Sequence, residues 1–243
     1  MTEFLPVSSS GHLVLFQRLL GLKEPELFFD VLLHLATMAA TVCFFRNELS
    51  EIIGSGARRE KSGLTYLSYI LVATIPTLLI GFATAHNYES IFASLNVVRA
   101  GFFATALILV VPSFLPHNPA GEVTGLRALL IGTMQGLSVI PGLSRSGSTI
   151  MTGIILGVNQ RSSFTFSFIL SIPAIASAVG LHVAQGKFFT TFPVPAMFLG
   201  FAAAFFSSYL SLAILKKVVM RMKMHFFGYY LLALTLFTFA FSG

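Results

Sequence analysis

The chain has 243 residues, of which 55% are hydrophobic and 10% are charged, and its mean hydropathy is +0.85. This composition excludes a water-soluble globular domain and indicates a polytopic membrane protein. The net charge of +6 comes from basic residues in short loops between apolar segments. It therefore reflects membrane topology, and no nucleic-acid partner is expected.

The first polar segment, residues 2–13 (TEFLPVSSSGHL), lies where a cleavable signal peptide would have its apolar core, so no such signal is expected. It carries a carboxylate on Glu3, an imidazole on His12 and three hydroxyls between them, on Ser8, Ser9 and Ser10. Each also has a structural interpretation: the glutamate as a frayed end, the serines as helix caps and the histidine as part of a polar turn.

Six apolar segments are long enough to cross a bilayer, which takes about 20 residues. We expect these spans at 27–46, 65–86, 94–114, 162–182, 194–215 and 226–242. Most lysines and arginines fall on one side of this threading, which the positive-inside rule makes cytoplasmic, so the C-terminus is expected outside. Arg99, near the outer end of its span, is expected to reach the membrane surface. Asp30 and His34, four residues apart on one helix face, are expected to pair with each other.

A second polar segment, PGLSRSGST at residues 141–149, separates two apolar stretches, 128–140 and 150–158, that are each too short to span. They indicate two half-helices that enter the membrane and meet at Arg145. An arginine at membrane depth costs roughly 2.5 to 3.5 kcal/mol, and irregular backbone survives there only where it lines a cavity. A guanidinium beside helix N-terminal amides favours phosphate. The alternative is an ordinary turn whose arginine extends to the surface.

An internal repeat relates the two polar segments. Sliding the chain by 136 residues pairs Ser8 with Ser144, Ser10 with Ser146, Gly11 with Gly147, Gly21 with Gly157, and Phe28 with Phe164. Three full spans separate the copies, so the halves enter from opposite faces, and such inverted repeats place their site near the membrane midplane. We expect an all-α polytopic membrane protein that forms a single integral-membrane domain over 1–243. Its repeats cover 1–115 and 127–243 and are joined by a cytoplasmic loop at 116–126.

The two loops together would bring a carboxylate, an imidazole, hydroxyls and a guanidinium into one membrane cavity, which suits hydrolysis of a phosphoanhydride. Arg145 would neutralise phosphoryl oxygens, a hydroxyl or water would attack, His12 or Glu3 would handle the proton, and Glu3 could hold a divalent cation. A transporter or lipid flippase would share the repeat and could bind an anion without cleaving it. His12 beside Glu3 favours hydrolysis, and hydrolysis combined with translocation stays open.

EFLPVSSSGHL and PGLSRSGST are similar to the two signature loops of the undecaprenyl-diphosphate phosphatase family, also called the bacitracin-resistance family. The resemblance extends to LFFDVLLHLAT and RSSFTFSFILSIPAIA. It implies a multi-pass enzyme of the bacterial inner membrane, surrounded by membrane lipids, that removes the terminal phosphate from a C55 polyprenyl diphosphate left by cell-wall assembly. It also implies dependence on a divalent cation, Mg²⁺ or Ca²⁺. The oligomeric state stays open, a homodimer included.

The resemblance also implies a role for each motif residue. Glu3 is the second glutamate of an E-x-x-x-E pair and a metal ligand, Ser9 is a candidate nucleophile, and His12 is a general acid or base. Arg145 clamps the phosphate. The substrate-binding residues are Ser8, Ser10, Ser144, Ser146, Gly147 and Thr149. The motif leaves the nucleophile undecided. A second rival, the acid-phosphatase-like lipid phosphatases, needs a later histidine motif, and no histidine follows Arg145 before His182.

One position departs from the family pattern. The first glutamate of the E-x-x-x-E pair would lie four positions before Glu3, ahead of Met1, and the offset pairs it with Gln135. The half-helix equivalent to 128–140 would likewise precede residue 2 and is missing. We therefore expect the 243-residue chain to be weakly active or inactive, and a chain extended at its start to be active.

Overall fold

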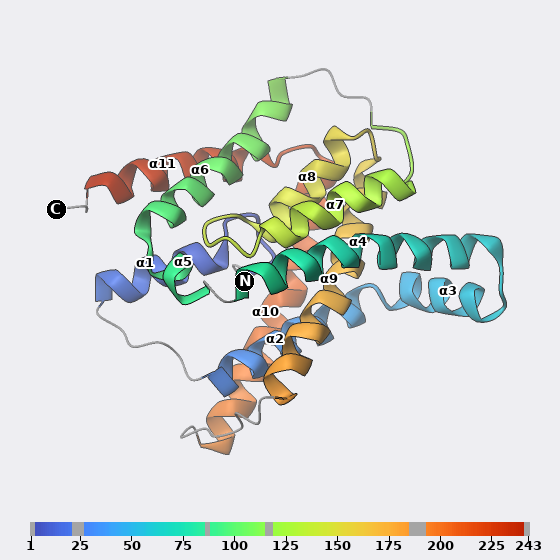
Figure 1. The fold of residues 1–243 in the computed structure, drawn as a ribbon, viewed down its shortest axis with the longest axis horizontal. Helices are drawn as coiled ribbons and strands as arrows, with labels where there is room; N and C mark the ends of the chain where they lie inside the picture. Colours follow the sequence, from blue (N-terminus) through green and yellow to red (C-terminus); the bar gives the residue numbers. More distant parts are fainter. Residues whose placement is uncertain (1–2, 21–26, 86–87, 115–118, 185–192, 241–243) are drawn as a thin grey trace.

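The computed structural model describes residues 3–20, 27–85, 88–114, 119–184 and 193–240 (Figure 1). Throughout these ranges the chain is helical and forms no strand, and a single isolated parallel bridge joins Gly121 to Val158. The expected all-α class is therefore confirmed.

The helices follow one another along the chain with short connections. They are α1 (Ser9–Leu20), α2 (Leu27–Phe44), α3 (Arg46–Ala57), α4 (Lys61–Ala85), α5 (Tyr88–Ala93), α6 (Leu95–Val110), the 3₁₀ turn η1 (Val111–Phe114), α7 (Gly125–Leu137), α8 (Arg145–Ile155), α9 (Gln160–Ala184), α10 (Val194–Met220) and α11 (His225–Ala240).

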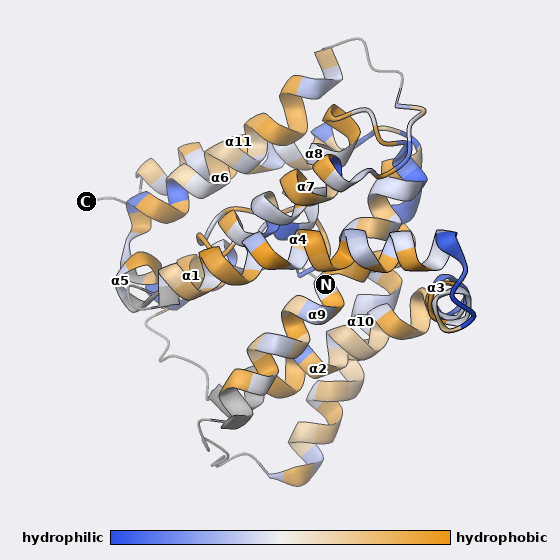
Figure 2. Ribbon diagram, turned by 45° about the vertical axis from the view of Figure 1, so that its right-hand side comes forward, coloured by the Kyte–Doolittle hydropathy of each residue, from blue (hydrophilic) through white to orange (hydrophobic). Residues whose placement is uncertain are grey.

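Four of these segments are long and apolar enough to cross a membrane. They are Lys61–Thr84, Leu95–Phe114, Gln160–Leu181 and Val194–Met220, which match four of the expected spans. The expected spans 27–46 and 226–242 correspond to α2 and α11, whose apolar stretches within the described residues are shorter. Hydrophobic residues cover most of the helical surface, whereas hydrophilic ones gather at the turn between α3 and α4 (Figure 2). The chain is thus a polytopic membrane protein, while the count of six spans stays a prediction.

Buried aromatic rings fix the first polar segment to the helix bundle. Phe4, which is fully buried, packs edge to face on Phe168 of α9, with ring centroids 5.3 Å apart. Phe168 in turn stacks on Phe45, at 6.0 Å. Burying a phenylalanine contributes about 1.5–3 kcal/mol, so Phe4 holds the residues next to it against α9.

Helix α7 lies directly against α4 over its length (Figure 1). Gly132 makes this approach possible, because a Cβ at that position would overlap the backbone of Ala73. Thr77 of α4 adds a hydrogen bond from its hydroxyl to the carbonyl of Gly132, 2.8 Å long. In the same way, α6 packs along α11 and α2 along α10.

Arg99 corrects an expectation from the sequence. It does not extend to the membrane surface but is buried in α6, with 7% of its surface exposed. Its guanidinium donates to Asn96 Oδ1 at 3.0 Å and to the carbonyl of Thr238, and it lies over the ring of Phe239. The reason is that α11 covers this face of α6, which the sequence does not reveal.

Candidate functional site

The second polar segment forms a turn between two short helices, as its apolar flanks predict. Helix α7 ends at Leu137 and α8 begins at Arg145, with Ser144 as the N-cap, whose hydroxyl accepts a hydrogen bond from the amide of Gly147 at 3.2 Å. Gly142 has φ +93°, and a Cβ there would meet the carbonyl oxygen of Val98. Arg145 therefore stands at a helix N-terminus, where unpaired amides favour an anion.

The first polar segment ends in the same capping arrangement. Helix α1 begins at Ser9, and the hydroxyl of Ser8 accepts a hydrogen bond from the amide of Gly11 at 3.3 Å. The Oγ atoms of Ser8 and Ser10 are 3.3 Å apart, and those of Ser144 and Ser146 are 3.5 Å apart. The cap thus recurs at the positions that the offset of 136 residues pairs.

The two polar segments pack against each other, as expected from the repeat. A Cβ on Gly147 would come within 2.9 Å of the Cβ of Pro6, and a Cβ on Gly11 would come within 2.9 Å of the Cα of Gly142. Glycine at Gly11 and Gly147 lets the two backbones approach this closely. The convergence of residues 2–13 on residues 141–149 is therefore found in the described part of the chain.

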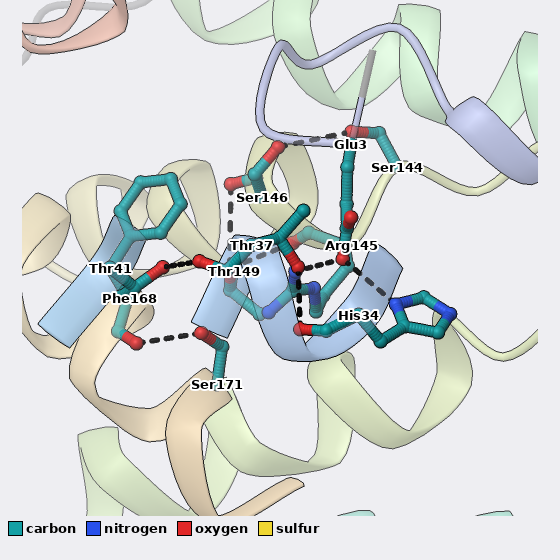
Figure 3. Close-up of polar contacts among 10 residues, drawn as sticks. All are labelled: Glu3, His34, Thr37, Thr41, Ser144, Arg145, Ser146, Thr149, Phe168 and Ser171. Atoms are coloured by element: carbon teal, nitrogen blue, oxygen red, sulfur yellow. Dashed lines mark hydrogen bonds and ion pairs between the residues drawn. The ribbon is translucent and has the colours of Figure 1, made fainter. Parts of the chain in front are cut away.

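A carboxylate and a guanidinium from opposite segments meet at the centre of this contact (Figure 3). Glu3 Oε1 lies 3.7 Å from Arg145 Nη2 and 3.3 Å from His34 Nδ1 of α2. The side chains of Glu3 and Arg145 are each 20% exposed, so a ligand can still reach them. At 3.7 Å the ion pair is loose, and the guanidinium keeps donors for a second anion.

Hydroxyl groups line the same place but differ in availability. Ser144, Ser146 and Thr149 are buried. The Thr149 hydroxyl bonds the carbonyl of Arg145 at 2.7 Å and the Ser167 hydroxyl, so it holds the first turn of α8 in place. Ser9, the first residue of α1, is partly exposed.

His12 lies apart from the Glu3 and Arg145 pair. Its ring is buried, and its hydrogen-bond partners among the described residues are the carbonyl of Ser8, 2.9 Å from Nδ1, and the hydroxyl of Tyr230, 2.7 Å from Nε2. A cavity of about 440 Å³ adjoins it, lined by Val7, His12, Phe226, Phe227 and Tyr230. The predicted constellation is thus divided into two neighbouring groups of side chains.

Sequence reasoning missed two residues of the site, His34 and Tyr230. His34 was expected to pair with Asp30, whose side chain lies outside the described part, but it contacts Glu3. A polar residue in an apolar span was the available signal for His34. No comparable signal singled out Tyr230, because its partner lies 218 residues away in the sequence.

The residues present fit a divalent cation only as partial ligands. Within the described residues no three His, Cys, Asp or Glu side chains gather. The site offers the carboxylate of Glu3 and the imidazole of His34. Magnesium in phosphoryl-transfer sites is held through one or two carboxylates together with substrate phosphates, so Glu3 fits as one ligand of such an ion.

Comparison with known proteins identifies the family. The model of the family described as bacitracin resistance protein BacA matches residues 1–237. A relative named undecaprenyl-diphosphatase from Thermosipho melanesiensis is 35% identical over 244 residues, covering 100% of this chain and 95% of the relative. Relatives of the same name from Carboxydothermus hydrogenoformans (37%, covering 95% and 88%) and Methanococcus vannielii (34%, covering 98% and 94%) are similar. Since these matches include both polar segments and the helices that hold them, the chain belongs to the bacitracin resistance protein BacA family.

Proposed function

We propose that this chain is a membrane phosphatase that hydrolyses undecaprenyl diphosphate to undecaprenyl phosphate and inorganic phosphate. The observation that carries the proposal is Arg145 at the N-terminus of α8, 3.7 Å from Glu3 of the opposite polar segment. Membership of the family and the names of its relatives support the same activity. In a bacterial inner membrane this reaction would recycle the lipid carrier of cell-wall synthesis and confer bacitracin resistance.

Binding of the terminal phosphate is assigned to α8. The guanidinium of Arg145 and the free amides of the first turn face the same side, and both favour a phosphoryl group whose charge increases in the transition state. Arginine offers two parallel N–H groups to two phosphate oxygens. The caps at Ser8 and Ser144 keep the two helix starts in register.

The chemical step is displacement at the terminal phosphorus. A new bond forms from the attacking oxygen to phosphorus, the bond from phosphorus to the bridging oxygen breaks, and undecaprenyl phosphate leaves. Two attacking groups fit this scheme: the partly exposed Ser9 hydroxyl, which would give a phosphoserine that water then hydrolyses, and water itself. His12 takes the proton of the attacking group, and Glu3 orients Arg145.

A divalent cation, Mg²⁺ or Ca²⁺, is proposed as the cofactor, with Glu3 as one of its ligands. When bound, such an ion neutralises charge on the phosphate oxygens. The Glu3 carboxylate also faces Arg145 and His34, so the three side chains together set how the diphosphate can lie.

The proposed architecture has six spans and an inverted repeat within one domain. Helices α1 and α8 begin at positions that the offset of 136 pairs, and both carry the same serine cap. The repeat-related helices α2 and α9 contact each other, as do α6 and α11. Contacts between equivalent elements are typical of a two-fold relation between halves, which supports a site at their interface near the midplane.

The test is phosphate release from C55 diphosphate by the purified chain in detergent, with and without EDTA. Release that Arg145→Lys removes and Arg161→Lys keeps is expected, because Arg161 lies at the exposed start of α9, away from the site. Binding of the diphosphate without release would instead indicate a transporter or flippase. Absence of both would refute the proposal.

A further inference from the structure

The hydrogen bonds of His12 fix which nitrogen carries its proton. The Ser8 carbonyl oxygen can only accept, so His12 Nδ1, 2.9 Å away, must donate and carries the hydrogen. In the neutral ring the lone pair is then on Nε2. The Tyr230 hydroxyl, 2.7 Å from Nε2, donates to that lone pair.

Tyr230 also fixes the orientation of the ring. Its own ring lies nearly parallel to that of His12, with an interplanar angle of 8° and centroids 5.7 Å apart. Phe102 of α6 closes the other side edge to face, at 5.4 Å. Helix α11, far along the chain from α1, therefore decides where Nε2 points.

The His12 and Tyr230 pair faces open space. Both line the cavity of about 440 Å³ beside Val7 in the first polar segment, and Tyr230 is 47% exposed. A purely structural histidine in a core would not need an exposed hydroxyl as its partner. A hydroxyl donates to a neutral imidazole and accepts from an imidazolium, so the same Tyr230 oxygen satisfies Nε2 before and after His12 takes a proton.

We infer that Tyr230 is a positioning residue of the phosphatase site, acting through His12; this inference rests on the proposed function. Tyr230 holds the Nδ1–H tautomer of His12 and the direction of Nε2. It does not contribute to binding of the diphosphate, which α8 and Arg145 perform at the neighbouring group of side chains.

The experiment compares Tyr230→Phe with Tyr229→Phe in the full chain, purified in detergent with C55 diphosphate as substrate. Tyr230→Phe keeps the stacked ring and removes only the hydroxyl, so kcat should fall about tenfold, as for one lost hydrogen bond, while KM and the thermal midpoint stay unchanged. Tyr229→Phe makes the same change at the neighbouring exposed position and should match the parent chain. In a His12→Ala background, Tyr230→Phe should cause no further loss.

Three results would overturn the inference. Parent kcat in Tyr230→Phe would show that the hydroxyl is dispensable, and an additional tenfold loss in the His12→Ala background would show that Tyr230 acts independently of His12. The third is a ¹⁵N NMR spectrum, assigned through His12→Ala, that places the hydrogen of neutral His12 on Nε2. Failure of the parent chain to release phosphate would count against the proposed function, and the NMR measurement still tests Tyr230 in that case.

Discussion

Replacing Arg145 by lysine separates the charge of this side chain from its geometry. Lysine keeps a positive charge at the start of α8 and beside Glu3, but it has no planar fork that can donate two parallel hydrogen bonds to one phosphate. If the fork is what stabilises the transition state, Arg145→Lys should be nearly as damaging as loss of the charge.

The structure gives the size of this effect. The contact between Arg145 and Glu3 is a loose 3.7 Å, so the strong partner of the guanidinium is expected to be the substrate. One hydrogen bond to a charged group contributes about 1.5–3 kcal/mol, and about 1.36 kcal/mol corresponds to a factor of ten. Arg145→Lys should therefore lower kcat/KM by about ten- to a hundredfold. Because the ion pair with Glu3 is kept, the thermal midpoint should move by about 2 °C or less.

The assay is phosphate release from C55 diphosphate in detergent, with the thermal midpoint measured on the same preparation. Arg161→Lys, an exposed arginine at the start of α9, is the matched control and should behave as the parent chain. Near-normal kcat/KM in a folded Arg145→Lys protein would remove Arg145 from the site. Loss of activity together with a collapsed midpoint would instead show a structural role for Arg145 and refute its assignment as the phosphate clamp.

Three further predictions concern the attacking group, the helix packing and the cation. Ser9→Ala and His12→Ala should each lower phosphate release about a hundredfold or more; full activity of the first with loss in the second would exclude serine attack. Gly132→Ala should lower the thermal midpoint, because overlap with Ala73 costs about 1–3 kcal/mol. Gly180→Ala, where a Cβ would have no neighbour within 4 Å, is its control, and equal midpoints would contradict the close packing of α4 and α7. EDTA should stop phosphate release and Mg²⁺ or Ca²⁺ restore it; undiminished release in EDTA would remove the cation from the reaction.

Local sequence signals predicted the helices and the two loops well. Apolar length predicted four spans, and a charged, serine-rich segment between two short apolar stretches predicted that a helix begins at Arg145. These features depend on neighbouring residues alone. The serine caps are local too, so the repeat could be read from the positions of Ser8 and Ser144.

Contacts between distant helices could not be predicted in the same way. His34 reaches Glu3 only because of how α2 packs behind the first polar segment, and Tyr230 reaches His12 only because α11 lies along α6. The same packing buries Arg99, which composition and position had placed at the surface. A single sequence records which residues are polar but not which helix covers them.

The repeat gives the two candidate catalytic positions a common origin. Ser9 and Arg145 are separated by the same 136 residues that relate the serine caps, and each is the first residue of its helix. Two helix N-termini that converge on one place concentrate positive potential there, which suits a diphosphate with several negative charges. If the halves are related by a two-fold axis, a hydroxyl on one helix start lies across the axis from a guanidinium on the other. Divergence at one equivalent position would then supply an attacking group on one side of the phosphate and a clamp on the other, the arrangement that in-line displacement requires.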